Sequence, residues 1–198
     1  MIRERIYDDP DVGQVLLRKR SGIRRLNLRV SATKGVSVSA PILSSYSHAI
    51  QFFLKKKPWV IRTLERQRAV LDEAIRDGRA YPDMPEEEKA RLVEQLRRQA
   101  REVLPARLRE LASLHGFTYN KVYIKHNLSN WGSCSRKGNI NLNLNLVRLP
   151  SRLSDYVMLH ELCHLSHMDH GKAFHELLES ICPSHEALQK ELRTWKLI

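Results

Sequence analysis

The segment from Tyr156 to Leu165 constrains the fold most, because it is apolar on nearly every side yet carries three ionisable residues. His160, Glu161 and His164 lie among seven apolar neighbours: Tyr156, Val157, Met158, Leu159, Leu162, Cys163 and Leu165. A helix that is apolar all round is buried in a core. Ionisable groups in such a helix cost free energy unless something pairs with them. The fold must therefore enclose this helix and supply a partner for its polar residues.

The spacing of these residues indicates what that partner is. His160 and His164 are four residues apart, so on a helix they share a face, about 40° apart around the axis. Two imidazoles placed in this way can reach one tetrahedral metal ion. Glu161 lies about 100° from His160 and is free to take a proton from a water molecule that the ion polarises. The pattern HELCH predicts a zinc site with a general base, and the alternative is three residues satisfied by the core or the surface.

A third ligand is then needed, and three histidines are candidates. His167 would lie on the far side of His164 from His160, which is a poor place to complete a tetrahedron. His170 is six residues beyond His164 and precedes Gly171, so the chain can fold back to the ion there. His175 belongs to the next predicted helix and could also approach. We favour His170, and we interpret the other two as solvated or supporting residues.

The composition is typical of a globular protein in a reducing compartment. The 198 residues are 42% hydrophobic and 28% charged, which fits one domain or one domain with an appendage. No apolar run approaches the roughly 18 residues of a membrane span, and the first residues lack the apolar core of a secretory signal. Three cysteines are too few for a disulfide framework. We therefore expect a soluble cytoplasmic protein without a membrane partner; the sequence indicates no oligomeric state.

Positive charge is concentrated near the N-terminus. Between Val12 and Leu64 there is no Asp or Glu, while eleven Lys and Arg residues occur in a chain of net charge +12. Such a segment attracts phosphates or acidic protein surfaces. We interpret segment 12–64 either as a nucleic-acid contact or as a solvated surface that maintains solubility. The candidate contact residues are Arg18, Lys19, Arg20, Arg24 and Arg25.

The hydrophobic periodicity predicts an α+β protein in two parts, residues 1–80 and 81–198. Alternating residues predict a three-stranded antiparallel meander over 14–40. Two helical segments separated at Pro58 follow over 45–77, and turn formers and acidic residues over 77–88 form a linker. A long helix is expected from Glu86 to His115, kinked or divided at Pro105.

Strands and helices alternate in the second part. KVYIKHN is expected to be a strand, and WGSCSRKGNINLNLNL a hairpin that turns at Lys137 and Gly138. Leucines alternate strictly with Asn141, Asn143 and Asn145, so the leucines face a core. The asparagines then form either a solvated sheet face or the polar floor of a cleft. After Pro150 the pattern is helical.

The segments WGSCSRKGNINLNLNLVRLP, DYVMLHELCHL and HGKAF resemble the YgjP-type family of zinc metallopeptidases, which is related to the SprT-like and WLM-like zincins. RKRSGIRRLNLRV, GVSVSAP and KPWVIRTLERQ fit the same family, so the resemblance covers nearly the whole chain. It implies that His160, His164 and His170 bind zinc and that Glu161 is the catalytic base. It also implies a zincin-like α+β fold: a backing helix, a small, mostly antiparallel sheet and a metal-binding helix. Asn130 and His175 depart from the residues usual in the family.

In zincins an edge strand along the cleft pairs with an extended substrate. If residues 130–136 form that strand, Trp131, Gly132 and Ser133 line the cleft, and Gly132 permits close backbone approach. The alternative is a core aromatic and ordinary strand packing. Candidate stabilisers of the oxyanion are Tyr156, Asn143 and Arg148.

Two functions follow from these features. The first is a zinc-dependent hydrolase, a metallopeptidase that cleaves an extended polypeptide with Glu161 as the base. The second is a nucleic-acid-associated binding module in which the metal is structural. Glu161 argues against the second, because a closed structural site needs no base and usually has cysteine ligands.

Overall fold

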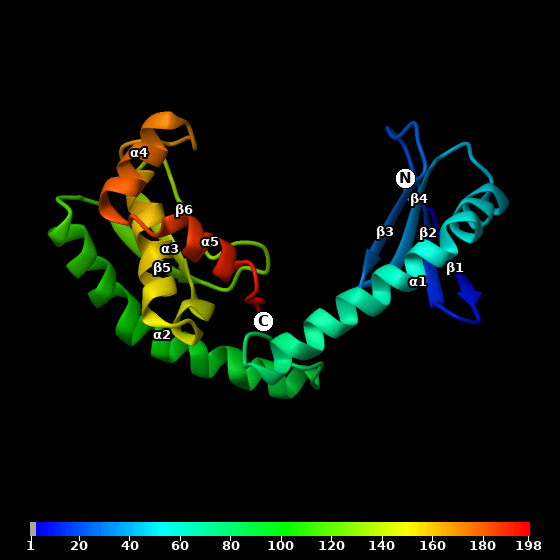
Figure 1. Cartoon of the computed structure of the whole chain (residues 1–198), viewed down its shortest axis with the longest axis horizontal. Coiled ribbons are helices and arrows are strands. Elements are labelled where there is room, and N and C mark those ends of the chain that lie inside the picture. Colours follow the sequence, from blue (N-terminus) through cyan, green and yellow to red (C-terminus); the bar gives the residue numbers. More distant parts are fainter. Residues whose placement is uncertain (1–2) are drawn as a thin grey trace. The chain divides into compact units, whose positions relative to one another are not determined.

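The computed structural model describes residues 3–198, which form a mixed α+β structure of two small sheets and five α-helices (Figure 1). The chain divides into two compact units, Met1–Arg76 and Asp77–Ile198. The boundary predicted from the sequence falls after residue 80, just beyond this division. Within the described residues, no helix combines the length and the apolar character that crossing a membrane would need.

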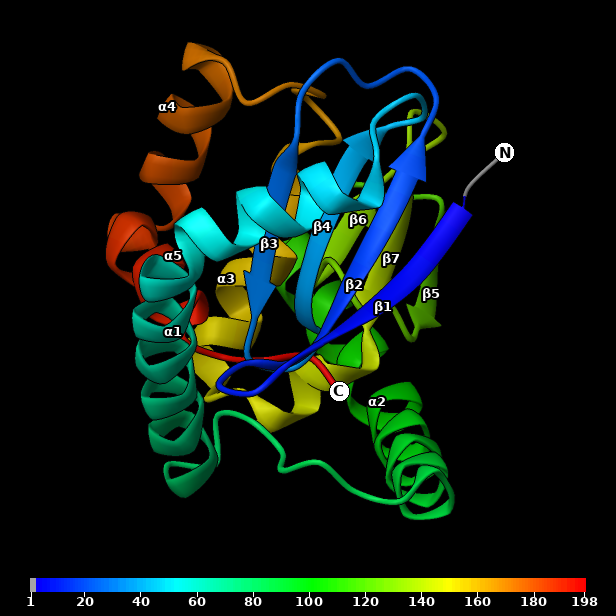
Figure 2. The same cartoon turned by 90° about the vertical axis from the view of Figure 1, so that its right-hand side faces the viewer.

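The N-terminal unit is a four-stranded sheet with a long helix, α1 (Tyr46–Arg76), against one face (Figures 1 and 2). Alternation in the strands buries the side chains that face α1, and Phe53 of the helix is fully buried among them. In the order β1-β2-β4-β3, the strands are β1 (Arg3–Asp9), β2 (Gly13–Arg20), β4 (Gly35–Pro41) and β3 (Asn27–Ser31).

The predicted antiparallel meander over 14–40 is wrong in its topology. β2 and β4 pair in parallel, β3 pairs with the far side of β4, and β1, which the sequence analysis missed, forms a hairpin with β2. The segment 21–26 between β2 and β3 is too long for a tight two-residue hairpin. β4 instead takes the central position, where Val36 and Val38 are buried.

Both long helices continue through their prolines, so the predicted separation at Pro58 is wrong, and α2 is not divided at Pro105. α1 contains Pro58, and α2 (Glu86–Leu114) contains Pro105. A proline removes one backbone donor and crowds the preceding turn. Buried residues on both sides of each proline hold the helix against its core, and this packing outweighs the local cost: Phe53, Val60, Leu104 and Leu108.

The C-terminal unit is a three-stranded sheet packed among helices. β7 lies in the centre, β5 pairs with it in parallel and β6 pairs with it antiparallel, so the sheet is mixed rather than mostly antiparallel. The predicted hairpin turns at Gly138, which has a φ of 71° that favours glycine. After α2 come β5 (Lys121–Lys125), β6 (Gly132–Cys134), β7 (Asn139–Asn143), the 3₁₀ helix η1 (Leu144–Arg148), α3 (Ser151–Cys163), α4 (Lys172–Ile181) and α5 (His185–Leu192).

Two of the three asparagines of the alternating segment, Asn143 and Asn145, form neither a solvated face nor a cleft floor. Asn143 is buried, and its Nδ2 donates to the backbone carbonyls of Asn127 and Asn130. Asn145 is also buried, and its Oδ1 accepts hydrogen bonds from Arg148 and from the backbone of Ile198. Asn143 thus holds the segment 127–130 in place by hydrogen bonds, and Asn145 does the same for the C-terminal residue. Asn143 and Arg148 are therefore engaged elsewhere and are poor candidates for stabilising an oxyanion.

Candidate metal centre

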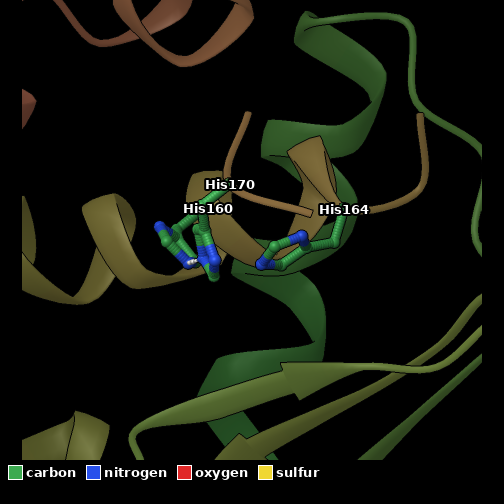
Figure 3. A group of neighbouring side chains, drawn as sticks. All are labelled: His160, His164 and His170. Carbon is green, nitrogen blue, oxygen red and sulfur yellow. Dashed lines mark hydrogen bonds between the residues drawn. The ribbon is translucent and has the colours of Figure 1, made fainter. Parts of the chain in front are cut away.

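Three histidines converge where α3 ends. His160 is in the last turn of α3, His164 caps it, and His170 lies in the connection to α4 (Figure 3). One nitrogen atom from each ring lies within 4.8 Å of the others. Nε2 of His160 and Nε2 of His170 are 3.1 Å apart. The structure thus brings together the two histidines of the helical motif and the loop histidine that the sequence favoured.

The local sequence explains why the chain folds back at His170. The backbone N–H of Gly171 donates to Oδ1 of Asp169 at 2.9 Å, which closes a tight turn around His170. A Cβ atom at position 171 would lie 2.8 Å from the same oxygen, so any other residue there would displace the Asp169 carboxylate. α4 begins at the next residue, which leaves His170 on a short, constrained segment beside α3.

His164 is oriented by a backbone contact. Its Nδ1 lies 2.9 Å from the carbonyl oxygen of His167, and a proton on Nδ1 donates to that oxygen. In the neutral tautomer that makes this contact, Nε2 of His164 is the nitrogen that can bind an ion. His167 therefore supports the site through its backbone. Nδ1 of His160, in contrast, is buried without a hydrogen-bond partner among residues 3–198.

Phe174 of α4 packs against all three histidine rings, a role that the sequence analysis missed. Its ring centroid lies 5.0 Å from that of His160, 4.6 Å from that of His164 and 4.8 Å from that of His170. Phe174 is fully buried, so it forms an apolar wall behind the rings. The signal available in the sequence was the apolar spacing of Phe174 and Leu178 on one face of α4.

This environment favours the neutral form of two of the imidazoles, those of His160 and His170. Burial, together with the neighbouring His164 and His170, lowers the pKa of His160 to about 4. Burial and His164 also lower the pKa of His170. At neutral pH both rings are in the unprotonated form that metal ions bind. The cluster could hold a metal ion without first losing protons from these two residues.

Glu161 follows His160 in α3, and its side chain lies against Gly132 of the edge strand β6. The side chain is buried, and burial raises its pKa to about 8. A Cβ atom at Gly132 would lie 2.7 Å from Cγ and 2.8 Å from Oε1 of Glu161. Any side chain at position 132 would therefore displace the carboxylate. The sequence analysis expected Gly132 to permit the close approach of a substrate backbone. In the structure the absence of a side chain at Gly132 also leaves space for Glu161.

The neighbours of Gly132 in the chain, Trp131 and Ser133, make contacts of their own. Trp131 is half-buried against the core of the C-terminal unit, and its carbonyl oxygen accepts from the backbone N–H of Asn143. Oγ of Ser133 accepts from Nδ2 of Asn141. These contacts fix the strand from one side. Tyr156, a candidate for the oxyanion, is buried with its ring 6.1 Å from that of His160.

The predicted basic contact residues fall into two groups in the N-terminal unit. Four line one hollow: Arg18, Arg20, Arg24 and Arg25. Lys19 points to the opposite face of the sheet, where its ammonium lies 4.5 Å from the centre of the Tyr46 ring. Strand alternation explains the difference, and the same alternation adds Arg29, which the sequence analysis omitted.

Comparison with known proteins assigns the chain to a family. Residues 71–194, more than half of the sequence, match the YgjP-like metallopeptidase domain. No curated protein matches. A solved structure, the metallopeptidase zymogen of Pyrococcus abyssi abylysin, is 21% identical with a TM-score of 0.41, over 46% of this chain and 95% of that one. The match over residues 71–194 includes the three converging histidines, and the chain belongs to the YgjP-like metallopeptidase family.

Proposed function

We propose that this protein is a zinc-dependent peptidase with a zincin-like C-terminal unit. In this proposal His160, His164 and His170 hold the ion, and Glu161 is the catalytic base. Membership in the YgjP-like family supports a metal-dependent peptidase, and the convergence of the three imidazoles supports the ligand set. The observation that carries the proposal is the convergence of the three imidazoles, with the buried Glu161 following His160 directly in the same helix.

The three histidines fit a zinc ion. Imidazole nitrogens bind zinc at about 2.0–2.1 Å, so two nitrogens of one tetrahedral site lie about 3.4 Å apart. The 3.1 Å between His160 and His170 is close to this value, and small side-chain rotations accommodate the wider separations, up to 4.8 Å. Neutral imidazoles suit zinc among the common metals. Three protein ligands leave a fourth position open, as in catalytic zinc sites.

The chemistry divides between the ion and Glu161. A bound zinc ion would lower the pKa of a water molecule and polarise the carbonyl that is to be cleaved. Glu161 would take the proton from the water and pass it to the leaving amine. Burial by itself raises the pKa of Glu161 to about 8, and a nearby cation would offset this effect and favour the ionised form that a base needs. A carboxylate in this position could serve as base and then as acid.

The edge strand supports an extended polypeptide as substrate. β6 pairs with β7 on one side only, so its other edge can pair with an added strand. Glu161 touches Gly132 within this strand, which would place the base next to a peptide bond of such a substrate. We propose that Trp131, Gly132 and Ser133 line the substrate cleft.

Substitution of the base tests this function. Glu161→Gln should retain about one zinc ion per chain and reduce the hydrolysis of an unstructured protein such as casein by at least 100-fold, since general bases contribute about 10²–10⁴-fold. Glu176→Gln is the matched control, because Glu176 is exposed on α4 and pairs only with Lys172. Undiminished hydrolysis by Glu161→Gln would contradict the proposed mechanism.

A further inference from the structure

The outer face of the N-terminal sheet differs sharply from the face that packs on α1. Strand alternation turns Val15 and Leu17 of β2 toward the helix. The same alternation turns Arg18 and Arg20 outward, together with Ser37 and Ser39 of β4 and Arg29 of β3. The sheet therefore has one apolar face covered by a helix and one face rich in guanidinium groups.

These outward residues enclose a hollow of about 560 Å³, which we call the arginine hollow. The central strand β4 contributes only short hydroxyl side chains, so it forms a low floor. In the pairing register Ser39 is opposite Arg18 of β2, and Ser37 is opposite Arg29 of β3. Long side chains thus stand on both sides of a serine floor. Five arginines line it: Arg18, Arg20, Arg24, Arg25 and Arg29.

The charge in the arginine hollow is mostly uncompensated. Arg18 pairs with Glu4 at 2.8 Å, and it is the one lining arginine with an ion pair among the residues that the structure describes. No carboxylate from residues 3–198 lines the hollow. Guanidinium groups gathered in this way repel one another, and an anion that bridges them would relieve that repulsion. Arginine is also the side chain best suited to phosphate, because its planar fork donates two parallel hydrogen bonds.

We propose that the arginine hollow binds the sugar-phosphate backbone of a nucleic acid. β2 and β3 are separated by β4, so Arg18 and Arg20 stand on a strand about 9.6 Å from the one that carries Arg29. Arg24 and Arg25 lie in the connection from β2 to β3. A phosphodiester lying above the serine floor can accept hydrogen bonds from arginines on both sides of it. No aromatic side chain from the described residues lines the hollow, so bases are not stacked and binding is independent of sequence. This site requires neither the metal ion nor Glu161.

Salt-dependent binding of an oligonucleotide tests the proposal. We would measure the fluorescence anisotropy of a labelled 20-nucleotide single strand of mixed sequence against the full-length, tag-free chain. Four phosphate contacts would make affinity fall on the order of 50-fold between 50 and 200 mM salt, because each contact adds about −0.7 to the logarithmic slope. Replacing Arg20, Arg24, Arg25 and Arg29 together with glutamine should weaken binding more than tenfold at 50 mM salt and flatten the slope.

A second quadruple variant of equal charge serves as the matched control. The side chains of Lys55, Lys56, Arg62 and Arg66 are all exposed on α1 of the same unit. Their replacement by glutamine changes the net charge by the same amount, and it should weaken binding less than threefold. Equal losses in both variants would overturn the proposal, because binding would then depend on overall charge alone. Unchanged binding by the arginine variant, with both variants folded by circular dichroism, would also overturn it.

Two further measurements distinguish a nucleic acid from an acidic protein as the ligand and test whether Arg18 takes part in binding. A polyglutamate peptide of equal charge should compete at least tenfold less well than unlabelled oligonucleotide. Equal competition would contradict a nucleic acid and indicate an acidic protein instead. Glu4→Gln releases Arg18 from its ion pair, so it should tighten binding several-fold and steepen the logarithmic slope by about 0.7. An unchanged slope would exclude Arg18 from the contact.

Discussion

The two units place their charged residues in opposite ways. Residues 1–76 contain 16 Lys and Arg against 7 Asp and Glu, a net charge of +9 out of +12 for the whole chain, and the arginine hollow displays part of it on an open sheet face. The C-terminal unit is closer to neutral and buries two ionisable residues of the HELCH motif, with Glu161 6% and His164 8% exposed. Long-range attraction tolerates loose placement of charges, whereas acid–base chemistry at a metal needs fixed positions. The N-terminal unit thus suits the capture of a polyanion, and the C-terminal unit suits catalysis.

The largest effect in the C-terminal unit is expected at Gly132. Gly132→Ala places a methyl group 2.8 Å from Oε1 of Glu161, so the carboxylate must move while the histidines stay in place. We expect kcat to fall about 100-fold with zinc content unchanged, since a small misplacement of a catalytic group can cost that much. Ser113→Ala, at an exposed position of α2, is the control and should keep most activity. If Gly132→Ala retained full activity, the buried site would not require such fixed positions.

A substitution of Phe174 shows whether this apolar ring contributes to zinc affinity as well as to the stability of the fold. Phe174→Ala removes the ring that contacts all three imidazoles, so we expect zinc affinity to fall about 10–100-fold. The free energy of unfolding of the metal-free protein should fall by about 3–5 kcal/mol. Leu178→Ala, also buried on α4, is expected to cost stability without a comparable loss of zinc affinity. Zinc affinity is measured by competition with a chelator. Equal losses of affinity in the two variants would mean that Phe174 contributes only through packing.

Asp9 tests the N-terminal unit, where a smaller effect with a defined pH dependence is expected. Burial of Asp9 acts to raise its pKa, but hydrogen bonds from Lys57 and from the backbone of Asp11 and Val12 outweigh it, and the pKa is lowered. The ionised form therefore stabilises the fold at neutral pH, and that contribution is lost as the pH falls through the lowered pKa. Asp9→Asn should cost about 1–2 kcal/mol of unfolding free energy at pH 7.

The pH profile checks the physical cause of that loss. The difference between wild type and Asp9→Asn in urea unfolding should shrink progressively as the pH falls below about 4, the usual pKa of an unfolded aspartate. Asp8→Asn, at the exposed neighbouring position, should be nearly neutral throughout. A difference that persisted at pH 2 would contradict an ionic origin.

Local spacing predicted more of the metal centre than of the sheets. The four-residue step from His160 to His164 needs only a helix to place both rings on one face, so the motif was visible in the sequence. Gly132 and Phe174 were not assigned their contacts, because those depend on how β6 and α4 pack against α3. The parallel pairing of β2 and β4 was missed for the same reason, since alternation reveals a strand but not its neighbour. The basic segment was visible as a charge pattern, and the alternation within β2 could have separated Lys19 from Arg18 and Arg20.

The most direct test of the account is the zinc stoichiometry of two loop-histidine variants, measured by inductively coupled plasma mass spectrometry on tag-free protein. His170 offers a ring nitrogen to the cluster, whereas His167 contacts His164 only through its backbone carbonyl. We predict about one zinc ion per chain in the wild type and in His167→Ala, and far less in His170→Ala. A wild type that stays free of zinc after loading, or a His170→Ala variant that retains it fully, would contradict the proposed metal centre.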